Sequence, residues 1–153
     1  MKETTQDKKI SKNLLPGEMS IKGFIGDDKR QLNQIINSDK VILDRLNLTA
    51  KMIADRLQHF TDAAFESYYG SIIIDEKYEV NYQSYRGKLI CPFSHPGIYR
   101  KGLITLKNLE NGNTISWTPL NIHMIREHCF FEGIGSVHRL EPEILKETLF
   151  SRE

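Results

Sequence analysis

The sequence is poor in cysteine and lacks both long apolar runs and a secretion signal. No stretch approaches the ~18 consecutive apolar residues that a membrane-spanning helix needs, and the N-terminus, MKETTQDKKISKNLL, is polar and charged. These absences argue against a membrane protein and predict a cytoplasmic location. The two cysteines, Cys91 and Cys129, are too few for a disulfide framework, so in that compartment we expect free thiols or metal ligands.

Extremes of composition are missing as well. Hydrophobic residues make up 39% of the chain and charged residues 27%, which are ordinary values for a globular domain and do not indicate wholesale disorder. A chain of 153 residues suits one domain with a core of its own. We predict a polar tail over residues 1–13 and a single domain over residues 14–153.

Acidic residues are absent from one stretch, residues 80–109, although the net charge of the whole chain is only +1. Bases interleaved with aromatic residues on strands are typical of proteins that bind single-stranded nucleic acid. A solvated strand face with aromatic residues in the core explains the same pattern. The stretch therefore suggests a site for an anion or a nucleic acid, with these candidate ligand-binding residues: Arg86, Lys88, Arg100, Lys101, Phe93 and Tyr99.

Two segments in the first half of the chain have helical periodicity. From Thr49, which can cap a helix, to Gly70, which can end one, apolar residues recur every three or four positions and form one stripe. We predict a long helix there. Before it, an Asp cap after Gly26 and apolar residues at Leu32, Ile35 and Ile36 predict a short helix.

The pattern changes after residue 70. The run SIIID (71–75) is β-branched, YEVNYQSYRG (78–87) alternates, and two further strand-like runs flank the turn residues Asn111 and Gly112. Thr118 and Pro119 then predict a helix through about His128, and PEILKETLF (142–150) predicts a last short helix. We therefore expect an α+β fold with about four antiparallel strands, a long N-terminal helix and short C-terminal helices.

Cysteine and histidine residues form two pairs with zinc-ligand spacing. Cys91 and His95 lie four positions apart in the turn LICPFSHPGIY (89–99), and His123 and His128 lie five apart in NIHMIREHCFF (121–131). These four residues are therefore candidate zinc ligands, with Cys129 as a substitute for His128. Positions five apart on an α-helix differ by about 140° around its axis, so the two histidines converge only if the last turn tightens or unwinds.

The same residues allow two alternatives. One is a buried turn without a metal, because cysteine is among the most buried residue types and histidine often bonds turn carbonyls. The other is a metal-dependent hydrolase in which Glu127 or Glu132 is the base that activates a metal-bound water. The segment HMIREH differs from the metalloprotease patterns H-E-x-x-H and H-x-x-E-H, whose histidines lie four apart. The spacing therefore favours structural zinc over catalytic zinc.

These patterns predict a small cytoplasmic α+β binding module. Its partner is expected to be an anionic ligand, a nucleic acid or a protein, and zinc is the only cofactor that the sequence suggests. The working surface is expected to be the turn at residues 91–101 together with the helix at 123–128. The second hypothesis is the metal-dependent hydrolase, and the third is a protein-interaction or regulatory subunit without catalysis that uses exposed aromatic side chains.

Overall fold

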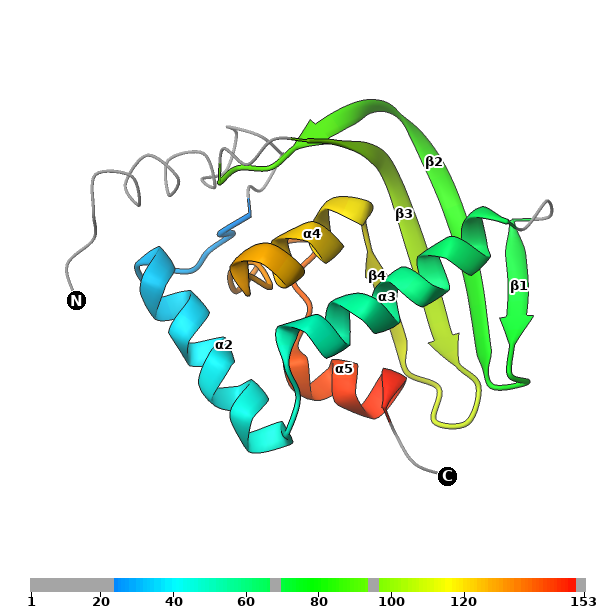
Figure 1. Cartoon of the computed structure of the whole chain (residues 1–153), viewed down its shortest axis with the longest axis horizontal. Helices are drawn as coiled ribbons and strands as arrows, with labels where there is room; N and C mark the ends of the chain where they lie inside the picture. The colour runs from blue at the N-terminus through cyan, green and yellow to red at the C-terminus, as the bar shows by residue number, and fades with distance from the viewer. Residues whose placement is uncertain (1–23, 67–69, 94–96, 151–153) are drawn as a thin grey trace.

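The computed structural model describes residues 24–66, 70–93 and 97–150, and only the backbone of residues 85–90, 100 and 101. The predicted tail at residues 1–13 lies outside this range. The fold is α+β, as predicted (Figure 1). Its elements are α2 (Leu32–Leu46), α3 (Ala50–Phe65), β1 (Ser71–Ile74), β2 (Tyr78–Ile90), β3 (Ile98–Asn108), β4 (Thr114–Trp117), α4 (Pro119–His128) and α5 (Pro142–Leu149).

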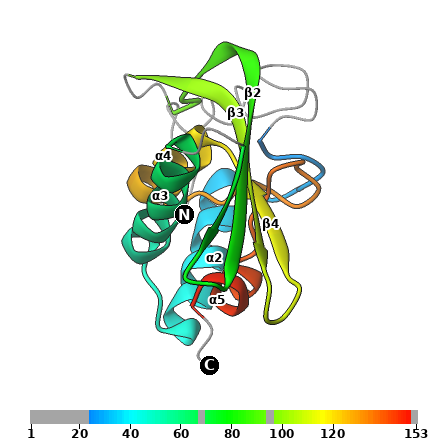
Figure 2. The ribbon, with the colours of Figure 1, turned by 90° about the vertical axis from the view of Figure 1, so that its right-hand side faces the viewer.

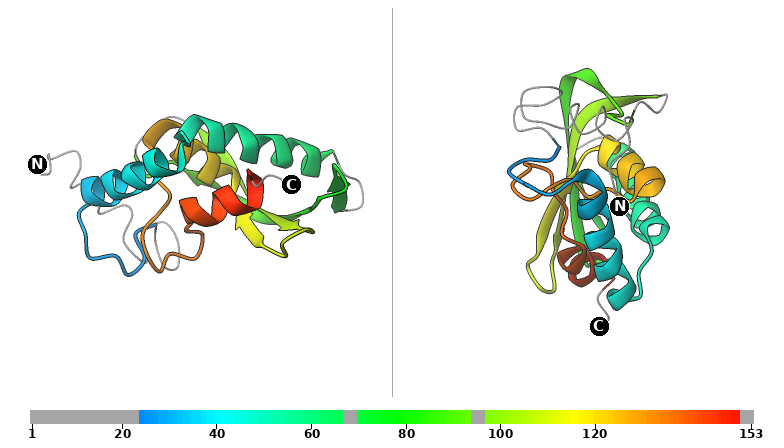
Figure 3. Two further views of the ribbon diagram at one scale, coloured as in Figure 1. Left: turned by 90° about the horizontal axis from the view of Figure 1, so that it is seen from below. Right: turned by 90° about the vertical axis from the view of Figure 1, so that its left-hand side faces the viewer.

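The four strands form one antiparallel sheet in the order β1-β2-β3-β4. Alternate side chains on β2, β3 and β4 are buried, among them Val80, Leu106 and Ile115, whereas their neighbours Glu79 and Lys107 are exposed. This period of two is that of a sheet with one covered face. Helices α3, α4 and α5 pack on the covered face, and Figures 2 and 3 show α3 and α4 on one side of the strands.

The hairpin predicted at Asn111 and Gly112 joins β3 to β4. Gly112 has the positive φ of 78° that the turn requires. The connection from Asn108 to Thr114 is longer than a two-residue turn. The side chain of Asn108 stabilises it by accepting hydrogen bonds from the backbone N–H groups of Glu110 and Asn111. The side-chain amide of Asn108 donates to the carbonyl of Thr148 and so fixes the hairpin against α5.

Helix α3 begins where the sequence predicts, because the Thr49 hydroxyl accepts a hydrogen bond from the N–H of Met52 at 3.1 Å. The apolar stripe of α3 packs on the buried face of the sheet in the main core. There the Trp117 indole donates to the Thr61 hydroxyl at 2.8 Å. The helix ends at Phe65, before the predicted end at Gly70, and the Phe65 ring packs edge-on against Tyr82 of the sheet.

Helix α2 is longer than the short helix predicted from Leu32, Ile35 and Ile36, because it runs on to Leu46. Its buried stripe continues through Asp39, which is charged and so interrupts the apolar pattern. The predicted Asp cap is also wrong: the N-cap is Gln31. Asp28 instead binds the side chain of Arg30, and this ion pair holds the pKa of Asp28 at about 2.

A second apolar cluster lies beside the main core and carries the candidate site. It joins the start of α2 to α4 and to the chain that leaves β2. Its buried members are Phe24, Ile25, Leu32, Ile35, Cys91, Leu120, Met124 and Phe130. Among the described residues, no helix is both long enough and apolar enough to cross a membrane.

Candidate metal centre

Helix α4 supplies the two histidines. The helix is fixed at its start by a reciprocal cap, in which Thr118 accepts from the N–H of Asn121 and Asn121 accepts from the N–H of Thr118. It ends at His128, and the next residue, Cys129, has a left-handed φ of 50°. His123 and His128 are both half-buried, and their ring centroids lie 5.4 Å apart. The two rings therefore converge despite their separation of about 140° around the helix axis.

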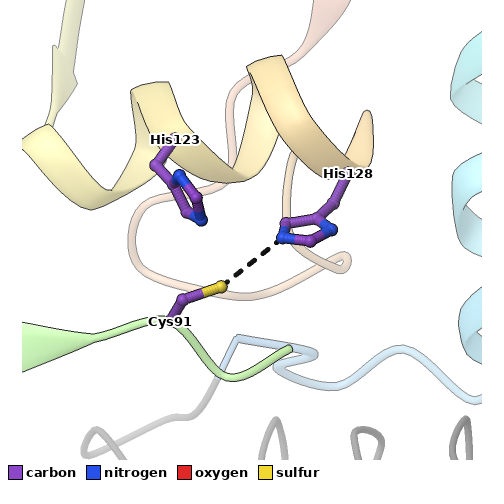
Figure 4. A group of neighbouring side chains, drawn as sticks. All are labelled: Cys91, His123 and His128. Atoms are coloured by element: carbon purple, nitrogen blue, oxygen red, sulfur yellow. Dashed lines mark hydrogen bonds between the residues drawn. The ribbon is translucent and has the colours of Figure 1, made fainter. Parts of the chain in front are cut away.

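Cys91 reaches this pair from the sheet. It is the first residue after β2 and is 3% exposed. Its Sγ lies 3.5 Å from Nε2 of His128. The ligand atoms of Cys91, His123 and His128 all lie within 4.8 Å of one another, and the three side chains point toward one another (Figure 4). Two distant elements, β2 and α4, thus meet at one point.

The spacing of these atoms fits a zinc ion. With Zn–S of about 2.3 Å and Zn–N of about 2.0 Å in tetrahedral geometry, two ligand atoms on one ion lie about 3.3–3.6 Å apart. The separation of 3.5 Å between Cys91 Sγ and His128 Nε2 falls in that range. The atoms of any wider pair lie within 4.8 Å of each other, so such a pair closes with at most about 1.5 Å of side-chain movement, which χ rotations supply. One thiolate and two imidazoles are ligands that zinc prefers.

Two aromatic rings hold the imidazoles in place. Phe93 stacks on His128, with ring centroids 4.0 Å apart and planes 6° from parallel, and Phe130 packs edge-on behind Phe93. Tyr99 of β3 lies against His123 at 4.9 Å. Burial raises the pKa of the Tyr99 hydroxyl, and the negative charges of Cys91 and Glu127 raise it further. Phe93 and Tyr99, predicted to contact a ligand, thus contact the histidines.

Two of the predicted metal ligands, His95 and Cys129, are not in this group of described ligand atoms. His95 is outside the described residues. Cys129 is half-buried and packs against the main core cluster, whereas Cys91 belongs to the second cluster. Burial raises the pKa of the Cys129 thiol. Cys129 is not a member of the group of ligand atoms formed by Cys91, His123 and His128.

The two glutamates predicted as bases differ in their surroundings. Glu127 is exposed on α4. Glu132 is 2% exposed and accepts hydrogen bonds from the side chains of Asn121, at 2.6 Å, and Ser136. Burial raises the pKa of Glu132 to about 7, although these two hydrogen bonds and Arg139 act in the opposite direction. Glu132 therefore anchors the turn after α4 to the start of that helix, a role that no local sequence pattern indicates.

The predicted anion site is only partly described. The side chains of Arg86, Lys88, Arg100 and Lys101 lie outside the described part of the structure. Their backbones are in β2 and β3, where Lys88 pairs with Arg100. Since Phe93 and Tyr99 both pack against the histidines, their rings are engaged within the protein.

No family model, no curated protein and no solved structure matches this chain. Its function is therefore inferred from the geometry of the cluster made by Cys91, His123 and His128.

Proposed function

We propose that this chain is a zinc-stabilised binding module in which Cys91, His123 and His128 hold the ion. The observation that carries the proposal is the grouping of one sulfur and two imidazole nitrogens within 4.8 Å, contributed by two elements that are far apart in sequence. The aromatic packing of both imidazoles supports it, because groups around a metal site that fix the orientation of histidine ligands raise metal affinity.

His95 is proposed as the fourth ligand. It lies four positions after Cys91, and the described residues on either side of it contact the cluster: Phe93 stacks on His128, and Tyr99 lies against His123. The described chain on both sides of residue 95 is therefore held at the cluster. Four protein ligands make a closed, structural site. Such an ion ties the end of β2 to α4.

Metal analysis tests this proposal. Protein purified without added metal should carry about one zinc ion per chain, and cobalt in its place should give the absorption of a tetrahedral thiolate site. Protein that contains no metal, takes up none and melts at the same temperature with and without chelator would support the metal-free buried turn instead.

X-ray absorption of the zinc form then separates structural from catalytic zinc. Four protein ligands, with one lost to water in His95→Ala, would support the closed site. Three protein ligands and a water in the unaltered chain would support the hydrolase alternative. In that case Glu127 becomes the base to test, because Glu132 is bound by Asn121 and Ser136.

The partner is proposed on charge alone. Residues 80–109 contain no acid, so we propose an anionic ligand for this module, with nucleic acid as the first candidate. Binding to short oligonucleotides should weaken steeply with salt and should fall in a variant that combines Arg100→Ala with Lys101→Ala. No binding at low salt would remove the nucleic-acid hypothesis and favour a protein partner.

A further inference from the structure

The far halves of β2 and β3 extend past the rest of the sheet. β1 pairs with β2 only over residues 78–81, and β4 pairs with β3 only over residues 104–107. Beyond them, residues 84–90 and 98–102 form a two-stranded ribbon, which we call the ribbon arm, with no further strand beside it among the described residues. The arm runs past β1 and β4 and curves over α4 (Figures 1 and 2).

The ribbon arm is weak by itself. A two-stranded ribbon is at best marginally stable in water. Here the ladder is also interrupted, because the register shifts between Ser84 and Lys88, and such irregularities leave residues unpaired. The arm therefore depends on attachments outside its own hydrogen bonds.

The described attachments are at the tip, on α4 and on the second apolar cluster. Cys91 follows the last residue of β2 and places its sulfur 3.5 Å from the His128 imidazole. Phe93 stacks on His128, and Tyr99 packs on His123. The metal cluster is thus divided between two bodies: the arm brings the thiol, and α4 brings both imidazoles.

We propose that metal binding at Cys91, His123 and His128 switches the ribbon arm between a docked state on α4 and a released state. The switch rests on the metal site of the proposed function. Only the docked arm offers the thiolate and the imidazoles together, so the ion binds the docked state more tightly than the released one and shifts the population toward docking. Without the ion, the tip keeps its apolar and aromatic packing and the sulfur–nitrogen hydrogen bond, but it loses the bonds that run through the metal.

Hydrogen exchange on the full chain tests the switch, with the zinc content of each sample measured in parallel. Amides of residues 84–91 and 98–102 should exchange about 10- to 100-fold more slowly with zinc in excess than after chelation. Amides of residues 104–107 and 114–117, in the four-stranded part, should stay protected after chelation, and zinc should slow them by no more than it raises the free energy of unfolding of the whole chain. Returning zinc should restore the slow exchange.

Variants separate the switch from general instability. His128→Ala should leave the arm in fast exchange at any zinc concentration, and Cys91→Ser should do the same from the other side of the cluster. Cys129→Ser is the matched control, since its side chain packs in the main core, and it should retain the zinc response.

The outcomes also distinguish the switch from the metal site itself. Stoichiometric zinc with identical exchange of the arm in both forms would overturn the switch and leave the metal site standing. Loss of protection in both parts of the sheet after chelation would also overturn it, because the ion would then hold the whole fold. A chain that binds no metal would overturn both.

Discussion

The Phe93 ring stacks on the His128 imidazole, with ring centroids 4.0 Å apart. Nε2 of the same imidazole lies 3.5 Å from Cys91 Sγ. Phe130 supports Phe93 from its edge. A stacked imidazole has little freedom to rotate, so its nitrogen is oriented before any ion arrives, and less entropy is lost when the ion binds.

Phe93→Leu should weaken zinc binding without removing a ligand. Loss of a group that orients a metal ligand typically costs 10- to 100-fold in affinity, and we expect roughly tenfold here. Competition with a chelator of known affinity measures it. Phe65→Leu is the matched control, because Phe65 packs on Tyr82 in another part of the fold. Equal affinities in the two variants would contradict a positioning role for Phe93.

Cys91→Ser and Cys129→Ser should separate the two thiols. At zinc concentrations about 100 times the Kd, the ion adds about 2.7 kcal/mol to the free energy of unfolding. We expect this gain in the unaltered chain and in Cys129→Ser, and little of it in Cys91→Ser. Thermal melts with and without chelator give the comparison. A gain lost in Cys129→Ser and kept in Cys91→Ser would assign the ligand to the other cysteine.

Glu132 should make the protein less stable as the pH rises from about 4.5 to about 7. Its pKa is raised from 4.5 to about 7, so the folded protein holds a proton over this window that the unfolded chain releases. The stabilisation is complete below about pH 4.5 and is lost as the pH passes through about 7, with roughly 3 kcal/mol as the upper limit.

Glu132→Gln should flatten this slope, because glutamine keeps an acceptor for Asn121 and cannot ionise. Urea unfolding of both proteins at the two ends of the window, in the presence of chelator, measures the slopes. Parallel slopes would show that Glu132 does not titrate in this window.

Removing only one partner of the ion pair between Asp39 and Arg139 should lower the free energy of unfolding strongly. The pair is bidentate, at 2.8 and 3.0 Å, and the side chains are 2% and 8% exposed. Arg139→Met leaves the Asp39 charge buried without this partner, which should cost about 3–5 kcal/mol of unfolding free energy. Asp39→Leu combined with Arg139→Met should regain much of this loss.

An exposed ion pair provides the control. Arg45 and Glu143 lie 3.4 Å apart, with side chains 65% and 60% exposed. Arg45→Met should therefore cost less than about 1 kcal/mol. Denaturant unfolding of both single variants gives the comparison, and equal losses would contradict the effect of burial.

Local signals in the sequence were enough for most of the fold. The stripe from Ile53 to Phe60, the Thr49 and Thr118 caps and the turn at Gly112 each act over a few residues, and the structure confirms the elements they predict. The ends predicted for α2 and α3 differ from those in the structure. In α2, the buried position 39 is an aspartate whose partner, Arg139, lies 100 residues away, and no local pattern reveals that pairing.

The residue types of the candidate site can be recognised along the chain: a thiol after a strand and two histidines on one short helix. That these three meet, and that Cys129 packs in the main core, depends on how the helices pack on the sheet. Angular spacing along α4 predicted that His123 and His128 converge only if the last turn tightens or unwinds. The fold brings Cys91 to the helix where both rings reach it. Spacing along a chain fixes neighbours within one element, whereas convergence between elements depends on how β2, β3 and α4 pack.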